Sequence, residues 1–377
     1  MADKPSHDTS STRRRYLKHA GILSAVGLSG LSGCSGNGGN GGNGGNGGNG
    51  GNGGNGGNGG NGGNGGNGGN GGNGGNDGWQ PEQNVRLVVP WGAGGGTDTA
   101  VRQVAQPAAE ILSDRGIDVE LNVENITGAG GMNGAQAVMD QPADGHTIFA
   151  DTNVLAPNIA DGTANFTLDD WGGIARMQYD TSWIWTSGVE DTYDDIYELV
   201  DSAPENGIQF GVTGGLDSAV FPIQFAQEAD ILEHMEIVAY DDAGQMENDI
   251  ITGEIDCGYA ELVEIEPIVE EGEAQLLFVG IEDEVEGYED VPNVEDTGWD
   301  AQFGVQRALV VQDGTPQEAI DFWSDIVQEA METDAYREFE SANYLDLREG
   351  YLSGPEHMEN LADMVDLFEE ALEAYDP

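Results

Sequence analysis

A run of Asn-Gly-Gly triplets over residues 37–76 separates a short N-terminal segment from the rest of this 377-residue chain. No side chain in the run can bury apolar surface, so we expect residues 35–78 to form a disordered linker. About forty residues of this composition have a root-mean-square reach of roughly 35 Å, which suits a tether. A low-complexity insertion without a mechanical role is the alternative. Any globular fold must therefore be built from residues 79–377.

Residues 1–34 are typical of an export signal. Residues 12–18, TRRRYLK, resemble a twin-arginine motif, and the apolar run at residues 20–31 is too short to span a bilayer. The run leads into the sequence LSGC at residues 31–34, which resembles a lipobox, and Cys34 would then carry the lipid. We expect a protein anchored by lipid on the extracellular face of the cytoplasmic membrane after twin-arginine export. A basic N-terminus with a chance cysteine is the alternative.

The formal net charge of −57 is extreme for a chain of this length. Both lysines, Lys4 and Lys18, lie in the N-terminal segment. The fixed cations of the remaining chain are seven arginines: Arg86, Arg102, Arg115, Arg176, Arg307, Arg337 and Arg348. Nucleic acids and anionic lipid surfaces are thereby excluded as partners of the folded part, because binding to them requires cations on the protein.

Acidity of this kind is common in disordered tails, but apolar residues recur with clear periodicity through residues 79–377. We interpret this part as a globular protein whose carboxylates face concentrated salt, as in halophilic archaea. Screening over roughly 3 Å at 1 M salt makes the repulsion among the carboxylates tolerable.

The chain lacks the motifs of common hydrolases. It contains neither G-x-S-x-G nor H-E-x-x-H, and His146, His234 and His357 are widely scattered. Cys257 is the only thiol besides Cys34, and its apolar neighbours favour a buried structural role over a nucleophile. We therefore expect no enzymatic activity, no metal and no cofactor. A secreted hydrolase is the alternative.

Strand-like and helix-like segments alternate in two sets along the folded part, which predicts an α/β fold with two lobes. The first set has strands at residues 85–90, 119–123 and 147–150 and helices at residues 97–112 and 134–139. The second has strands at residues 208–212, 236–240, 255–259 and 276–279 and helices at residues 218–229 and 245–252. Two apolar segments, residues 174–187 and 302–311, are expected to cross between the lobes, and helices at residues 316–331 and 355–375 to close the chain.

The domain boundaries follow from these segments. We expect lobe 1 to begin with residues 79–180, lobe 2 to comprise residues 181–304, and residues 305–377 to complete lobe 1 with the C-terminal helices.

The first strand leads through the glycine-rich sequence WGAGGGT into a helix. A phosphate-binding loop requires a lysine that is absent here, and a dinucleotide fingerprint requires a third glycine where Thr97 stands. What remains is a set of backbone N–H groups at a helix N-terminus, which binds a carboxylate without a charged side chain. We expect this anion site at Gly94, Gly95, Gly96 and Thr97, with Asp98 as an N-cap or brace of the loop. A tight turn without a ligand is the alternative.

A second glycine-rich turn, GVTGGLDS at residues 211–218, leads from a strand into a helix of the second set. Two helix N-termini that face each other across a cleft would clamp a small anion. A chance pair of strand-to-helix turns is the alternative.

Several segments resemble the solute-binding proteins of tripartite tricarboxylate transporters, also called Bug-type receptors. The matching segments are VRLVVPWGAGGGTDTAVRQVAQ at residues 85–106, ENITGAGGMNGAQAVMDQPADGHTIFA at residues 124–150, AYDDAGQMENDIITGEIDCGYAEL at residues 239–262 and VPNVEDTG at residues 291–298. The sequence departs from this family in lobe 2. Asp241 and Asp242 stand where the family often has Lys and Gly, and the turn at Asp217 lacks the usual Ser-Pro-Ser run.

The resemblance implies a periplasmic-binding (Venus flytrap) fold with two crossing strands between the lobes. It also implies capture of a small di- or tricarboxylate and delivery to a membrane transporter that has a large multi-span and a small four-span subunit. We expect a monomer. A receptor that reports its ligand to a membrane sensor, without transport, is the alternative.

The ligand-binding residues are predicted from their positions at strand ends and in the glycine-rich turns. They are Trp91, Gly94, Gly95, Gly96, Thr97, Gly130, Gly131, Asp151, Thr152, Asn153, Thr213, Gly214, Gly215, Ser218, Tyr259 and Glu261. For Gly130 and Gly131, close packing of a helix is the alternative.

Overall fold

The computed structural model describes residues 78–189, 192–213, 218–240 and 242–374, which belong to one compact unit. The predictions for the export signal, for Cys34 and for the glycine linker lie outside these residues, as do those for Gly214 and Gly215. None of the described helices is long and apolar enough to cross a membrane.

The first of two sheets has six strands in the order β11-β4-β10-β3-β1-β2. Its strands are β1 (Val85–Val89), β2 (Leu121–Asn125), β3 (Thr147–Thr152), β4 (Trp171–Tyr179), β10 (Gln306–Gln312) and β11 (Leu352–Ser353). β1 pairs with β2 and β3 in parallel, whereas β10 runs antiparallel to β3 and β4. The carboxyl ends of β1 and β3 therefore lie at the same edge of this sheet.

Helices cover both faces of the six-stranded sheet. One core cluster joins the sheet to α1 (Gly96–Asp114) and α9 (Gln317–Met331), with α10 (Asp334–Ala342) contributing at its end. The other face carries α2 (Met132–Met139), α3 (Leu155–Ala160) and α11 (Gly354–Ala374). Coverage on both faces explains why β1 is apolar almost throughout, with Val85, Val88 and Val89 fully buried.

The second sheet has five strands in the order β7-β6-β8-β5-β9. Its strands are β5 (Ser182–Ser187), β6 (Ile208–Thr213), β7 (Met235–Tyr240), β8 (Cys257–Glu261) and β9 (Ala274–Val279). Its helices are α4 (Ile196–Asn206), α5 (Val220–Glu228), α6 (Ala243–Ile251), α7 (Leu262–Glu271) and α8 (Val294–Thr297). The predicted α/β architecture with two lobes is thereby confirmed.

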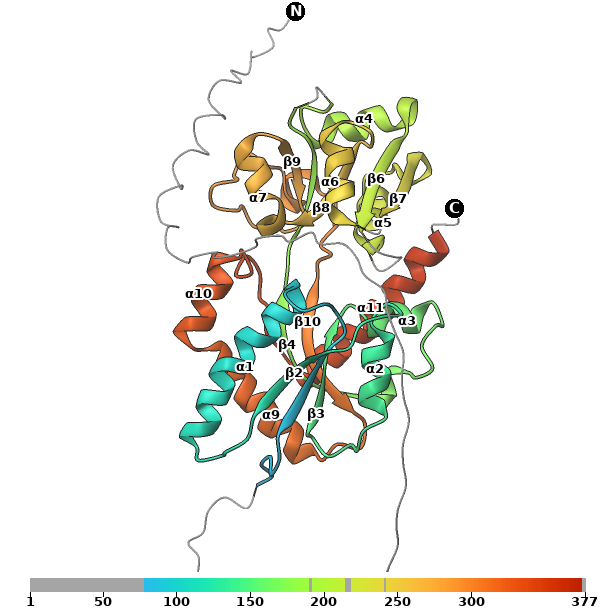
Figure 1. The fold of residues 1–377 in the computed structure, drawn as a ribbon. Helices are drawn as coiled ribbons and strands as arrows, with labels where there is room; N and C mark the ends of the chain where they lie inside the picture. The colour runs from blue at the N-terminus through green and yellow to red at the C-terminus, as the bar shows by residue number, and fades with distance from the viewer. Residues whose placement is uncertain (1–77, 190–191, 214–217, 241, 375–377) are drawn as a thin grey trace, which may run out of the picture. The chain divides into compact units, whose positions relative to one another are not determined.

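The chain passes between the two sheets in two adjacent crossings (Figure 1). β4 leads into β5 through Asp180 and Thr181, and the return segment precedes β10. Asp180 N–H donates to Val305 O at 2.8 Å, and a Cβ at Gly304 would lie only 1.9 Å from Asp180 O. Glycine is therefore required where the crossings touch, and the prediction of two crossing segments is confirmed.

Several boundaries differ from the predicted ones. β2 begins two residues later than expected, at Leu121, and α2 begins earlier, at Met132. The helices α3, α4, α7 and α10 were not predicted, because they are short or carry a proline or many acidic residues that obscure the apolar spacing.

Candidate functional site

The start of α1 is an open helix N-terminus. Its N-cap is Gly95, and within the described part of the chain no side chain caps this helix. Asp98 instead braces the preceding loop, because its carboxylate accepts from Gly94 N at 2.8 Å, Arg102 Nε at 2.9 Å and Asn125 Nδ2 at 3.0 Å. The expectation that Asp98 is a loop brace agrees with these contacts.

The backbone N–H groups without a helical partner lie at the start of α1, one step further along the chain than the predicted site. The N–H of Gly94 donates to Asp98, and that of Gly95 to Gly92 O at 3.3 Å. The first helical bond runs from Thr99 N to Gly95 O, so the N–H groups of residues 96–98 have no partner in their own helix. Gly94 and Gly95 therefore shape the turn, and the N–H groups without a helical partner begin at Gly96. The anion site at Gly94, Gly95, Gly96 and Thr97 stays a prediction.

A layer of polar side chains lies beside this helix start. Arg307 on β10 is the register partner of Thr152 on β3 and of Gln178 on β4, so the three lie side by side across the sheet. Leu309, which follows two residues later on β10, belongs to the core beneath α1. A Cβ at Gly96 would lie 2.8 Å from Arg307 Nη2, so glycine lets α1 begin against the guanidinium.

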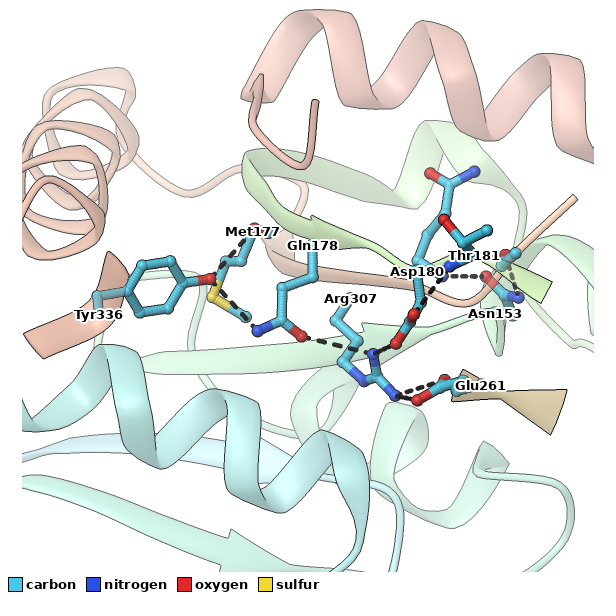
Figure 2. Close-up of polar contacts among 10 residues, drawn as sticks. Asn153, Met177, Gln178, Asp180, Thr181, Glu261, Arg307 and Tyr336 are labelled. Carbon is cyan, nitrogen blue, oxygen red and sulfur yellow. Dashed lines mark hydrogen bonds and ion pairs between the residues drawn. The ribbon is translucent and has the colours of Figure 1, made fainter. Parts of the chain in front are cut away.

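Arg307 connects the two lobes (Figure 2). Its Nη1 donates to Asp180 Oδ2 at 3.2 Å and to Gln178 Oε1 at 3.4 Å, and its Nη2 donates to Glu261 Oε1 at 2.8 Å. Gln178 in turn donates to the hydroxyl of Tyr336 at 3.4 Å. The guanidinium is thus held by the six-stranded sheet and the first crossing, and it reaches Glu261 at the end of β8.

Burial and mutual repulsion shape the charges of this cluster. Burial, followed by the nearby charge of Glu261, raises the pKa of Asp180 well above its ordinary value. The same two causes raise the pKa of Glu264 to about 7. Burial lowers the pKa of Arg307, but Glu261 and Asp180 outweigh it and leave that pKa raised. Within the described residues, Arg307 is therefore the one cation among the carboxyl groups of this cluster, and Asp180 and Glu264 hold their protons more readily than ordinary carboxyl groups do.

Three buried donors of this region lack a hydrogen-bond partner among the described residues. They are Arg307 Nε, Thr152 Oγ1 and Thr181 Oγ1. Buried polar groups in proteins nearly always have a partner, so these three donors are open to an acceptor that the described residues do not supply. A carboxylate offers about four acceptor positions on its two oxygens. No cluster of His, Cys, Asp and Glu in the described segments could hold a metal ion.

Two further predicted residues serve the fold. Asp151 is buried and accepts the N–H groups of Val154 and Leu155 at 3.1 Å each, which satisfies the start of α3. Asn153, at φ 46°, accepts from Gln306 N at 3.3 Å and so fixes the return crossing. Both side chains thus hold parts of the fold in place, and their role as ligand contacts stays a prediction.

The glycines before α2 both have a positive φ, and close packing constrains one of them. Gly131 has φ 85°, and a Cβ there would lie 2.7 Å from the side chain of Val154. Gly130 also has a positive φ and faces Asn158 across ordinary contact distance. Trp91 is half-buried against the core, and its carbonyl accepts from Asn125 at 2.9 Å. Close packing thus accounts for Gly131, a positive φ favours glycine at Gly130, and a ligand contact at either stays a prediction.

In lobe 2, the structure brings one predicted residue to the guanidinium, namely Glu261. Thr213 Oγ1 lies 3.6 Å from Met246 Sδ, and the ring of Tyr259 packs against Phe221 with centroids 5.3 Å apart. Ser218 is half-buried just before α5.

Arg307, Asp180 and Gln178 were missed as site residues. The sequence does contain a signal for Arg307, because it interrupts the apolar run of a crossing strand in a domain with few cations. An arginine in such a place is costly to bury unless carboxylates accompany it. Its partners are 46 and 127 residues away along the chain, so no local pattern identifies them.

Comparison with known families gives one match over most of the folded part. The model of the tripartite tricarboxylate transporter family receptor matches residues 100–363.

Relatives and solved structures agree with that match. A UPF0065 protein of Bordetella bronchiseptica is 26% identical over 253 residues, covering 66% of this chain and 73% of its own. The crystal structure of a TctC solute-binding protein from Polaromonas superposes with a TM-score of 0.66 at 21% identity, covering 78% of this chain and 99% of that one.

Two structures from Rhodopseudomonas palustris are also similar, at 18% identity and over 78% of this chain. MatC with bound malate has a TM-score of 0.63 and is covered over 100% of its length. A protein solved with adipate has a TM-score of 0.62 and is covered over 97%. At this identity the superpositions establish the shared fold.

Proposed function

The chain belongs to the tripartite tricarboxylate transporter receptor family, and from this premise we propose that it captures a small di- or tricarboxylate and delivers it to a membrane transporter. Members of this family and the structural neighbours are solute-binding receptors and not enzymes. Transporter subunits of the large multi-span and small four-span types would be its partners.

The observation that carries the proposal is the open start of α1 beside a buried guanidinium. Backbone N–H groups of residues 96–98 have no helical partner, and Arg307 Nε and Thr152 Oγ1 are buried donors without one in the described segments. All of these groups donate, and the helix dipole adds a partial positive charge at the same place. Such a set favours a carboxylate ligand, with Thr97 as a further hydroxyl donor.

Two comparisons support a ligand with two carboxylates. The similar proteins from Rhodopseudomonas palustris were solved with malate and with adipate, both of which are dicarboxylates. The two acids differ in length, so the comparison supports the class of ligand rather than one compound.

The test is calorimetric titration of ligand-free protein with mono-, di- and tricarboxylates. Thr152→Val removes a buried hydroxyl at nearly constant volume and should weaken binding of the cognate acid about tenfold, because a hydrogen bond to an ionised acceptor contributes roughly 1.5–3 kcal/mol. Thr99→Val is the matched control, because Thr99 is half-buried and its hydroxyl is not one of the buried donors without a partner among the described residues. Binding that is unchanged in Thr152→Val would place the ligand elsewhere.

We also propose that residues 1–34 direct export and that a lipid on Cys34 anchors the receptor outside the cytoplasmic membrane. The linker at residues 35–78 would separate the anchor from the lobes, which we assign to residues 79–180 with 305–377 and to residues 181–304. Cys34→Ser should release the protein from membranes into the medium. A variant that stays with the membrane pellet would argue against the lipid anchor.

The acidic composition supports adaptation to concentrated salt. With a formal net charge of −57, carboxylates across the surface repel one another, and salt screens that repulsion. The midpoint of thermal unfolding should therefore rise between about 0.1 M and about 3 M NaCl. A constant midpoint would contradict a halophilic origin.

A further inference from the structure

The carboxylate of Glu261 occupies an unusual position for the residue at the start of a helix. Glu261 ends β8 and is the N-cap of α7, yet its side chain makes no capping hydrogen bond within the described residues. It reaches instead to Arg307 in the other lobe, with Nη2 at 2.8 Å from Oε1 and 3.2 Å from Oε2. The side chain is 14% exposed, so this ion pair is largely shielded from water.

The same guanidinium edge faces the proposed ligand site. A Cβ built on Gly96 would lie 2.8 Å from Nη2 and 3.7 Å from Nε, so this edge of Arg307 lies against the start of α1. Nη2 is bonded to Glu261, whereas Nε has no partner in the described part of the protein. A carboxylate at the α1 N-terminus would therefore meet the edge of Arg307 that Glu261 uses.

A third carboxylate at this edge would be repelled by the two that already pair with Arg307. Arg307 already pairs with Asp180 at 3.2 Å on its other nitrogen, and the side chain of Asp180 is 4% exposed. Two carboxylates thus share one cation, and Glu264 stands close enough to Glu261 for their charges to interact. A bound dicarboxylate would add negative charge beside carboxyl groups whose interaction with Glu261 already raises the pKa values of Asp180 and Glu264.

We propose that Glu261 is a built-in competitor for the ligand: its carboxylate holds Arg307 in the free receptor and is replaced there by a carboxylate of the bound acid. The inference rests on the proposed function and deepens it, because it names Arg307 as the cation that recognises the ligand and Glu261 as the group that limits affinity. Weakly charged or short acids that cannot displace Glu261 should therefore bind more weakly.

The experiment compares Glu261→Gln with Glu264→Gln by calorimetric titration with malate, adipate and acetate. Glutamine keeps the size of Glu261 but removes the charge that attracts Arg307, so the variant should bind the preferred dicarboxylate about tenfold more tightly. Glu264→Gln removes a carboxyl group from the same helix without touching an ion pair to Arg307, and it should change affinity by less than about threefold. Arg307→Lys keeps the charge but loses the planar fork, so it should weaken binding.

Unchanged or weaker binding in Glu261→Gln would overturn the inference, and weaker binding would make Glu261 a direct ligand contact. Equal tightening in both glutamine variants would also overturn it, since the effect would then be one of general charge. If the wild type binds none of the acids, binding by Glu261→Gln would support competition. If neither protein binds any of them, both the competitor role of Glu261 and the proposed function are rejected. Binding by the wild type with no gain in the variant rejects the competitor alone.

Discussion

The helices α1 and α3 begin at the same edge of the six-stranded sheet, yet their first turns are completed in opposite ways. α3 follows β3, and the carboxylate of Asp151 accepts the N–H groups of Val154 and Leu155. α1 follows β1, and its acid, Asp98, lies inside the first turn and accepts from Gly94 and Arg102 instead. The chain thus supplies a side-chain acceptor for the first helical N–H group of α3, whereas the start of α1 has no such acceptor among the described residues.

The difference teaches that the position of an acidic residue matters more than its presence at a strand end. A carboxylate that precedes the helix can curl onto the free N–H groups, as Asp151 does. A carboxylate at the third helical residue points back toward the preceding loop, as Asp98 does, and leaves the helix N-terminus to another anion. We expect an external carboxylate at α1 and none at α3.

The largest expected effect comes from closing the open start of α1. In Gly96→Ala the new methyl group would meet Arg307 Nη2 at 2.8 Å, so the guanidinium must move away from the helix start or α1 must begin differently. We expect affinity for the cognate dicarboxylate to fall at least about tenfold, measured by calorimetric titration in concentrated salt.

Gly95→Ala is the matched control for that change. Gly95 has φ −74°, which suits alanine, and a Cβ there would meet only Gly92 O at 3.4 Å. Affinity should fall less than about threefold. Equal losses in the two variants would mean that the flexibility of the loop, and not the approach of Arg307 to Gly96, matters for binding.

Local patterns in the sequence predicted the fold well. Buried parallel strands appear as continuous apolar runs, and amphipathic helices show apolar residues at helical spacing, so β1, α1, β6 and α9 could be placed from neighbouring residues alone. The two crossings were also recognisable, because they are longer apolar segments between the two sets.

The sequence indicates only part of the candidate site, because the geometry of that site depends on residues far apart in the chain. Glycine and a polar residue at a strand end mark an edge where ligands bind, but they do not reveal which N–H groups the loop itself uses. Asp151 and Thr152 are adjacent in sequence, yet Asp151 accepts a hydrogen bond from the start of α3, whereas Thr152 lies beside Arg307. The Arg307–Glu261 pair depends on how the lobes meet, which periodicity does not encode.

A second variant tests the closed helix start. Asp151→Ala leaves the N–H groups of Val154 and Leu155 buried without their acceptor, and loss of such a cap costs roughly 1–2 kcal/mol. The midpoint of thermal unfolding should fall by about 2–4 °C, whereas affinity for the dicarboxylate should stay within about threefold of the wild type. A large loss of affinity with an unchanged midpoint would restore Asp151 as a ligand contact.

The smallest expected effect is a difference between Asp98 and Asp151 in how their contributions to stability depend on pH. The hydrogen bond from Arg102 lowers the pKa of Asp98 from its ordinary 3.8 to about 2, and the N–H of Gly94 acts in the same direction. Burial raises the pKa of Asp151 from the same ordinary value to about 6, although backbone N–H groups oppose the shift. The folded protein therefore binds a proton at Asp98 less readily than the unfolded chain does, and at Asp151 more readily.

These shifts make the free energy of unfolding depend on pH in opposite directions. The contribution of Asp98 is complete above its ordinary pKa of 3.8 and is lost as the pH falls toward about 2. That of Asp151 is complete below 3.8 and is lost as the pH rises through about 6. Asp98→Asn and Asp151→Asn remove each titration in turn, and the free energy of unfolding is measured in concentrated salt from about pH 7 to about pH 3. As the pH falls from about 7 to about 4, the free energy of unfolding of the wild type should rise relative to that of Asp151→Asn. Over the same range its difference from Asp98→Asn should stay constant, and that difference should shrink only below about pH 4. A constant difference between wild type and Asp151→Asn over that range would mean that Asp151 stays ionised, and the contrast between α1 and α3 would then be one of geometry alone.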